Sequence, residues 1–116
     1  MSYVDGYVLA TPKKSLKAYR RMAALGKKAW MKHGAVDYKE CVGDDLAVKF
    51  GVPFTRLMKL KPAETAVFAY IVFKSRAHRD RVNAKVIKEM AAMGAPKDMP
   101  FDLKRMVYGG FKTIVE

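Results

Sequence analysis

The spacing of hydrophobic and polar positions changes several times along the chain, and each change predicts a different element. Residues 3–10 (YVDGYVLA) are rich in Val and Tyr and predict a strand. Residues 16–33 repeat their apolar positions at helical spacing, with Ser15 as N-cap and Gly34 after the last turn, and predict a long helix. Residues 35–42 alternate between apolar and polar side chains and predict a half-buried strand.

The second half of the chain repeats this order of strand, helix and strand. Residues 65–73 (TAVFAYIVF) are apolar on both faces, which predicts a strand in the middle of a sheet. Ser75 is placed to cap a second helix over residues 76–93. After a loop over residues 97–102, residues 104–115 predict a last strand that contains a pair of glycines, typical of a bulge or of a close backbone approach.

These elements predict an α+β fold with the ferredoxin-like order βαββαβ, in which the first and third strands lie in the middle of a four-stranded antiparallel sheet. Residues 46–62 join the second and third strands. A structureless loop of this length is uncommon, so we expect a loop followed by a short strand or a turn of helix. The fold predicts both helices on one face of the sheet.

The two faces of the first predicted strand differ in size. Val4, Gly6, Val8 and Ala10 form a small, smooth face on which we expect the helices to lie. The opposite face, which carries Asp5, is then left open. Because so large an exposed apolar area is unfavourable, we expect a second copy to cover it in a homodimer with sheets packed face to face.

Composition bounds the class of protein. The 116 residues suit one domain over 1–116, and a hydrophobic content of 51% excludes a disordered chain. A single cysteine, Cys41, permits no internal disulfide. The longest apolar run, residues 66–73, is far below the roughly 18 residues that span a bilayer, and no signal peptide is recognisable at the start. These features predict a cytoplasmic protein without a membrane partner.

Asp5 is a charge in the middle of an otherwise apolar strand, and a buried carboxylate requires a partner. Arg105, on the neighbouring last strand, is one candidate for that partner. Two interpretations stay open: a polar cleft between the sheets that binds or transforms a small organic ligand, or a structural ion pair at the dimer interface. The candidate pocket comprises Asp5, Tyr7, Tyr38, Glu40, Tyr70, Arg105 and Tyr108.

The formal net charge of +12 introduces a second functional hypothesis, the binding of nucleic acid such as RNA. The aromatic residues Tyr19 and Trp30 lie on the buried side of the first predicted helix, where they cannot stack on bases. A well-solvated surface is the alternative explanation of the charge. The basic face of this helix includes Lys13, Lys17, Arg20, Arg21, Lys27 and Lys28.

Other candidate chemistry has ordinary structural explanations. His33, His78 and Cys41 do not have the spacing of a metal site, and nothing near Cys41 would activate it as a nucleophile, so we expect it to be a buried structural residue. The chain contains no GxGxxG and no GxxxxGK motif, so no cofactor is expected. An enzyme and a binding protein are both compatible with this pattern.

Several segments resemble one known family. They are residues 3–6 (YVDG), 43–45 (GDD), 61–68 (KPAETAVF) and, most specifically, 99–111 (MPFDLKRMVYGGF). The chain is similar over nearly its whole length to the YbaA-like family, a domain-of-unknown-function family of the dimeric α/β-barrel superfamily. The resemblance implies a ferredoxin-like subunit and a dimer, and it implies no particular activity.

Overall fold

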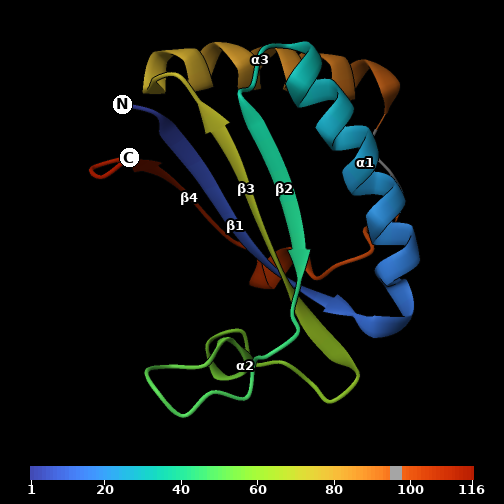
Figure 1. Ribbon diagram of the computed structural model, residues 1–116. Helices are drawn as coiled ribbons and strands as arrows, with labels where there is room; N and C mark the ends of the chain where they lie inside the picture. Colours follow the sequence, from blue (N-terminus) through green and yellow to red (C-terminus); the bar gives the residue numbers. More distant parts are fainter. Residues whose placement is uncertain (95–97) are drawn as a thin grey trace.

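The computed structural model describes residues 1–94 and 98–116, so Lys97 of the predicted loop lies outside the described residues. The strands form one four-stranded sheet, and Figure 1 shows the main helices on one side of it. The elements in chain order are β1 (Tyr3–Pro12), η1 (Lys13–Ser15), α1 (Leu16–Lys32), β2 (Asp37–Val42), α2 (Phe54–Leu57), β3 (Glu64–Phe73), α3 (Arg76–Met93), η2 (Leu103–Arg105) and β4 (Val107–Lys112).

The α+β class and the predicted element order are confirmed. The sheet is antiparallel with strand order β2-β3-β1-β4, so the two predicted central strands are central. The helix predicted over residues 76–93 has these bounds, and its Ser75 cap accepts a hydrogen bond from the backbone N–H of His78. The arrangement agrees with a ferredoxin-like fold.

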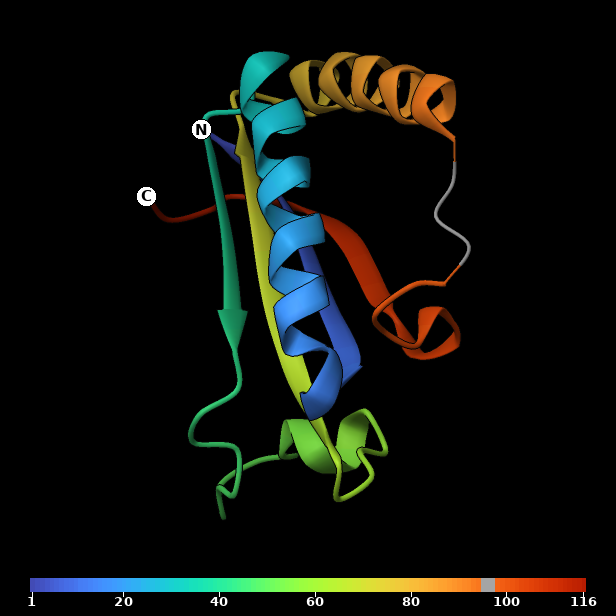
Figure 2. The same ribbon diagram turned by 90° about the vertical axis from the view of Figure 1, so that its right-hand side faces the viewer.

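The predicted use of the two faces of β1 was wrong. Tyr7 and Leu9 pack against the core beneath the helices, and Asp5 on the same face is fully buried. Figure 2 shows α1 lying along this face of the sheet. Both faces of β1 are largely apolar, and local sequence did not distinguish the face that receives the helices. The larger face, with its tyrosines, fills the space beneath α1 and α3.

The segment between β2 and β3 covers one end of the opposite face. Met58 is buried there against Val8, Ala10 and Ala66, so part of the small face is core as well. The short helix α2 supplies the ordered turn that the length of this segment predicted. The rest of this face is open, and we call it the open face. It carries Phe68 and Tyr70 of β3, Val107 and Phe111 of β4, Val4 and Gly6 of β1, and Lys39 and Cys41 of β2.

One smaller expectation was wrong: Cys41 is exposed rather than buried. The buried stripe of α3 is short, because α3 lies across the end of the strands (Figure 1) and only Val82 and Val86 reach the core. Within the described residues, no helix is both long and apolar enough to cross a membrane.

Candidate functional site

The first polar network on the helix-covered face surrounds Asp5. Oδ1 of Asp5 accepts a hydrogen bond from Nη1 of Arg79 at 2.6 Å. Oδ2 of Asp5 accepts hydrogen bonds from Nδ2 of Asn83 and from the hydroxyl of Tyr108, both at 3.3 Å. Arg79 and Asn83 are one turn apart on α3, so one helix supplies both donors. Asp5 is 0% exposed, and a charge this deeply buried requires such partners. We call this set the Asp5 network.

The glycine pair of β4 makes the Asp5 network possible. The pairing of β4 with β1 is continuous through Gly109 and Gly110, without a bulge. A Cβ atom added at Gly110 would overlap the Tyr3 hydroxyl and lie 2.7 Å from Nη1 of Arg79. The close-approach interpretation of the pair therefore holds at Gly110, where the missing side chain leaves room for Arg79 to reach Asp5.

Tyrosines complete this network. Tyr7 stacks on Tyr108 with ring centroids 4.7 Å apart, and the Arg79 guanidinium lies 4.9 Å from the ring centroid of Tyr3. Burial is the main cause that raises the pKa of Tyr7 above its ordinary value, and the nearby charge of Asp5 adds to it. The pKa of Tyr108 is raised by the same two causes in the same order. Both hydroxyls therefore keep their protons at neutral pH.

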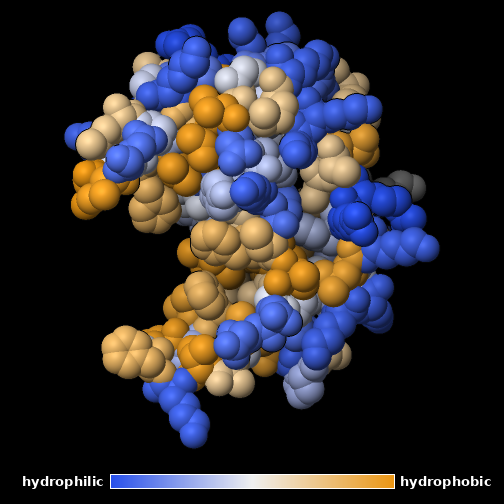
Figure 3. Space-filling model, viewed as in Figure 1, coloured by the Kyte–Doolittle hydropathy of each residue, from blue (hydrophilic) through white to orange (hydrophobic). Residues whose placement is uncertain are grey.

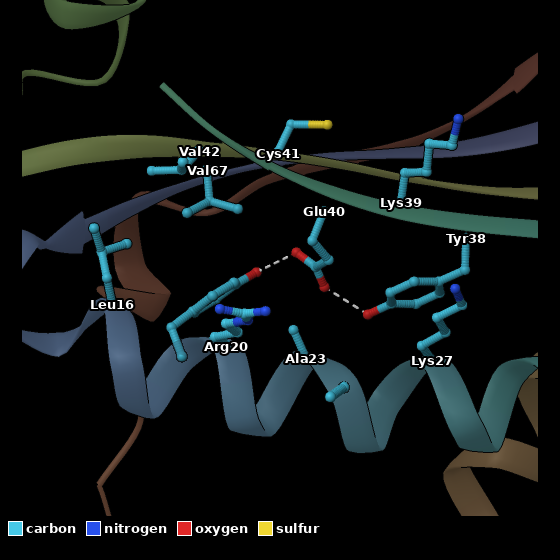
Figure 4. A pocket seen from close by; sticks show the side chains of 12 residues that line it. Leu16, Arg20, Ala23, Lys27, Tyr38, Lys39, Glu40, Cys41, Val42 and Val67 are labelled. Carbon is cyan, nitrogen blue, oxygen red and sulfur yellow. Dashed lines mark hydrogen bonds between the residues drawn. The ribbon is translucent and has the colours of Figure 1, made fainter. Parts of the chain in front are cut away.

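The second polar network lies between α1 and β2. Figure 4 shows Glu40 pointing from β2 toward α1, with a tyrosine on each side of its carboxylate. The hydroxyl of Tyr19 donates to Oε1 at 2.6 Å, and the hydroxyl of Tyr38 donates to Oε2 at 2.5 Å. A Cβ atom at Gly26 of α1 would lie 3.2 Å from the Tyr38 hydroxyl, so glycine in this helix allows the close approach of Tyr38.

Tyr19 and Tyr38 keep their hydroxyl protons and act as hydrogen-bond donors. Burial raises the pKa of Tyr19 and of Tyr38 well above the ordinary value, and the hydrogen bond to Glu40 and the charge of Glu40 raise it further. Each carboxylate oxygen of Glu40 is thus held by one neutral donor, and no cation pairs with Glu40 among the described residues. A carboxylate has about four acceptor positions, so Glu40 retains acceptor capacity.

Glu40 lines a cleft of about 620 Å³ between α1 and β2, which we call the Glu40 cleft. Its volume lies within the roughly 300–1,000 Å³ typical of small-molecule sites. Leu16, Ala23 and Val67 are among its apolar walls, and Arg20 and Lys27 of α1 line it as well. The arrangement combines a mainly apolar lining with one fixed acceptor and nearby positive charge.

The seven predicted pocket residues lie in four places. Asp5, Tyr7 and Tyr108 form the first network, and Tyr38 and Glu40 belong to the second. Both networks are on the helix-covered face, and Tyr7 packs against the core cluster that contains Tyr38. Tyr70 is on the open face, away from both. Arg105 lies elsewhere and does not pair with Asp5: it donates to the carboxylates of Glu64 and Asp102.

Three functional candidates were not found from the sequence: Arg79, Asn83 and Tyr19. Arg79 and Asn83 share helical spacing with the buried Val82 and Val86, and this pattern would have placed them on the inner side of α3. Tyr19 was expected on the buried side of its helix, where it lies, but its partner on another strand could not be read from local spacing.

The predicted basic residues of α1 and of η1 before it are exposed. His33 caps the end of α1, where its Nε2 lies 3.6 Å from a Glu89 carboxylate oxygen. Within residues 1–94 and 98–116, no three His, Cys, Asp or Glu side chains come together as a metal site.

This geometry defines a small α+β protein with two carboxylate networks beneath its helices, one fully buried at Asp5 and one partly buried at Glu40. The chain belongs to the family described as "Protein of unknown function (DUF1428)", which matches residues 2–103. It is 36% identical over 116 residues to "Uncharacterized protein YbaA" of Escherichia coli (strain K12), and the match covers 100% of this chain and 99% of the relative. The protein of that name from Shigella flexneri gives the same identity and coverage.

Among solved structures, the chain is similar to the "De novo designed protein Foldit4". The TM-score is 0.50 at 7% sequence identity, and the match covers 97% of this chain and 99% of the designed one. At this identity the likeness concerns the fold alone.

Proposed function

We propose that the protein binds a small organic molecule in the Glu40 cleft. The observation that carries this proposal is the carboxylate of Glu40, which two neutral tyrosine hydroxyls hold in place while one side of the group faces a cleft of ligand size. Fixed polar groups in a mainly apolar pocket are typical of small-molecule sites. The binding site thus moves from the space between two sheets, where the sequence placed it, to the space between α1 and β2.

The test fills the cleft from an exposed wall position. Ala24 of α1 lines the cleft and is exposed, so Ala24→Trp adds a large side chain there without replacing a core residue. Ala18 lies on the same helix, is also exposed and does not line the cleft, so Ala18→Trp is the matched control. Binding is measured by fluorescence titration with the neutral aromatic amine N-phenyl-1-naphthylamine.

We expect Ala24→Trp to weaken binding of this probe at least tenfold and Ala18→Trp to leave it unchanged. A steric block acts on any occupant of the cleft, whatever its polar groups. Equal binding by the two variants would overturn the proposal, because the probe would then be bound elsewhere on the molecule.

The protein is further proposed to act as a homodimer in which two open faces pack together, as in a dimeric α/β barrel. The chain exposes 8,360 Å², whereas a folded monomer of its mass exposes about 6,400 Å². Large apolar side chains account for part of this surface: Phe111 on the open face is 62% exposed, and Phe50 in the segment before α2 is 97% exposed. Figure 3 shows a hollow with hydrophobic side chains around it, which suits a second copy.

Sedimentation of paired variants tests the dimer. Phe111→Ser removes an exposed apolar side chain from the open face. Leu25→Ser is the matched control, because it removes an apolar side chain from α1 that is also 62% exposed. We expect Phe111→Ser to raise the dimer dissociation constant at least tenfold and Leu25→Ser to leave it unchanged. A wild-type chain that sediments as a monomer at micromolar concentration would contradict the proposal.

Nucleic-acid binding is the second candidate function. The observation that favours it is a stripe on α1 in which Lys17, Arg21 and Lys28 are exposed and form no ion pair within the described residues. Attraction to phosphates alone declines steeply with salt. A sequence preference for RNA that persists at physiological salt would support this function, and binding seen only at low salt would count against it.

A further inference from the structure

The charges that line the Glu40 cleft indicate the chemical class of its occupant. Arg20 and Lys27 on α1 line the cleft, and Glu40 is the one acidic residue among its lining residues. Neither of these two cations forms an ion pair among the described residues, whereas Lys32 on the same helix pairs with Glu89. The cleft therefore carries an excess of uncompensated positive charge.

These two cations stand at a defined spacing on α1. Arg20 and Lys27 are seven residues apart, which places them on one side of the helix at about 10 Å along its axis. In the view of Figure 4 they lie on either side of Glu40. An acid group on a bound molecule could thus reach a cation at either end while another part of the molecule reaches Glu40.

The centre of the cleft requires a different chemistry from its ends. The hydroxyls of Tyr19 and Tyr38 already donate their hydrogen bonds to Glu40, so the group available to a ligand at the centre is the Glu40 carboxylate, an acceptor. A ligand must therefore present an N–H or O–H at this point. Leu16, Ala23 and Val67 provide the apolar walls for the body of the molecule.

We infer that the ligand is an amphipathic organic anion. It has an apolar body, an N–H or O–H that donates to Glu40, and a carboxylate, sulfonate or phosphate group that Arg20 or Lys27 binds. A hydrogen bond between ionised partners is roughly twice as strong as one between neutral partners, so the acid group makes a large contribution to the affinity. This inference rests on the proposed function of the cleft and adds the class of ligand to it.

Two matched probes test the charge requirement. N-phenyl-1-naphthylamine and 8-anilinonaphthalene-1-sulfonate share their rings and their N–H donor, and only the second carries a sulfonate. The double variant Arg20→Gln/Lys27→Gln removes the two cations of the cleft. The control Lys17→Gln/Lys28→Gln removes two exposed cations of the same helix that do not line the cleft, so both variants have the same net charge.

We expect the cleft variant to weaken binding of the sulfonate probe at least tenfold and to change binding of the neutral probe less than twofold. The control variant is expected to change neither probe by more than twofold. Equal losses of sulfonate binding in the two double variants would overturn the inference, since the attraction would then come from the net charge of the whole chain.

The same titrations separate this inference from the proposed function. Suppose that Ala24→Trp blocks the neutral probe but Arg20→Gln/Lys27→Gln does not weaken binding of the sulfonate probe. The cleft is then a binding site, and the inferred class of ligand is wrong. If Ala24→Trp blocks neither probe, the proposed function itself fails.

Discussion

Asp5 and Glu40 are two carboxylates beneath the same helices, and their surroundings differ in one decisive respect. Asp5 is 0% exposed and is paired with the cation of Arg79 at 2.6 Å. Glu40 is only partly buried, accepts from two neutral hydroxyls and borders a cleft. A cation neutralises the first charge within the protein, whereas the second has hydrogen bonds but no ion-pair partner among the described residues.

This difference separates a structural carboxylate from one suited to binding. A buried charge with a paired cation mainly holds elements together, and removal of one partner leaves an uncompensated charge. A carboxylate fixed by neutral donors keeps acceptor positions for a ligand. Asp5 does form an ion pair, but the pair lies beneath the helices rather than at a dimer interface, and the cation is Arg79 rather than Arg105.

The largest expected effect comes from removing the cation of the Asp5 network. Arg79→Met leaves Asp5 buried without a counter-charge, and we expect the free energy of unfolding to fall by about 3–5 kcal/mol. Urea unfolding measures it. The control is Arg81→Met, which removes an exposed arginine of the same helix and is expected to change stability by less than about 0.5 kcal/mol.

A double variant keeps this prediction decisive if Arg79→Met does not fold. Asp5→Asn/Arg79→Met removes both charges, so we expect it to be more stable than Arg79→Met alone. If the two variants were equally stable, the buried charge would not be the cause of the loss.

A smaller effect is expected from closing the passage of Arg79 to Asp5. In Gly110→Ala, the added methyl group must displace Tyr3 or Arg79, and we expect a loss of about 1–3 kcal/mol. Gly109→Ala is the matched control, because its nearest neighbouring atom is a Phe111 side-chain carbon at 3.7 Å, an ordinary contact. Thermal unfolding measures the stability of both variants. Equal losses of stability in Gly110→Ala and Gly109→Ala would contradict this role of Gly110.

The smallest effect on stability, about 1 kcal/mol, is expected from Glu40→Gln, because an amide has one acceptor oxygen for two hydroxyls. The pH dependence is more informative. The folded pKa values of Tyr19 and Tyr38 lie above the unfolded value of about 10, so their contribution to stability is fully present below pH 10 and is lost as pH rises above it.

Because Glu40 adds to these pKa shifts, Tyr19 and Tyr38 should ionise at lower pH in Glu40→Gln than in the wild-type protein. Absorbance at 295 nm follows the titration. Asp45→Asn, which neutralises an exposed carboxylate outside both networks, serves as control and should titrate like the wild type. Identical curves for Glu40→Gln and wild type would show that burial alone holds the protons on Tyr19 and Tyr38.

Much of the fold could be predicted because its signals are local. The helical spacing of α1, the cap at Ser75 and the apolar run of β3 each depend on neighbours within a few residues. The candidate site was harder, since its contacts join distant segments: Asp5 and Arg79 are 74 positions apart, and Tyr19 and Glu40 are 21 apart. Residue type identified Asp5 and Glu40 as candidates, but it did not identify their partners.

The sequence by itself determined the order of strands and helices, the central place of β3 and the exposure of the basic residues of α1, because periodicity and charge act locally. Only the tertiary structure decided which face of β1 lies under the helices. Both faces of that strand are largely apolar, and the choice depends on the volume available beneath α1 and α3. That choice buried Asp5 against Arg79, and the packing of β2 beside α1 left Glu40 at the edge of a cleft.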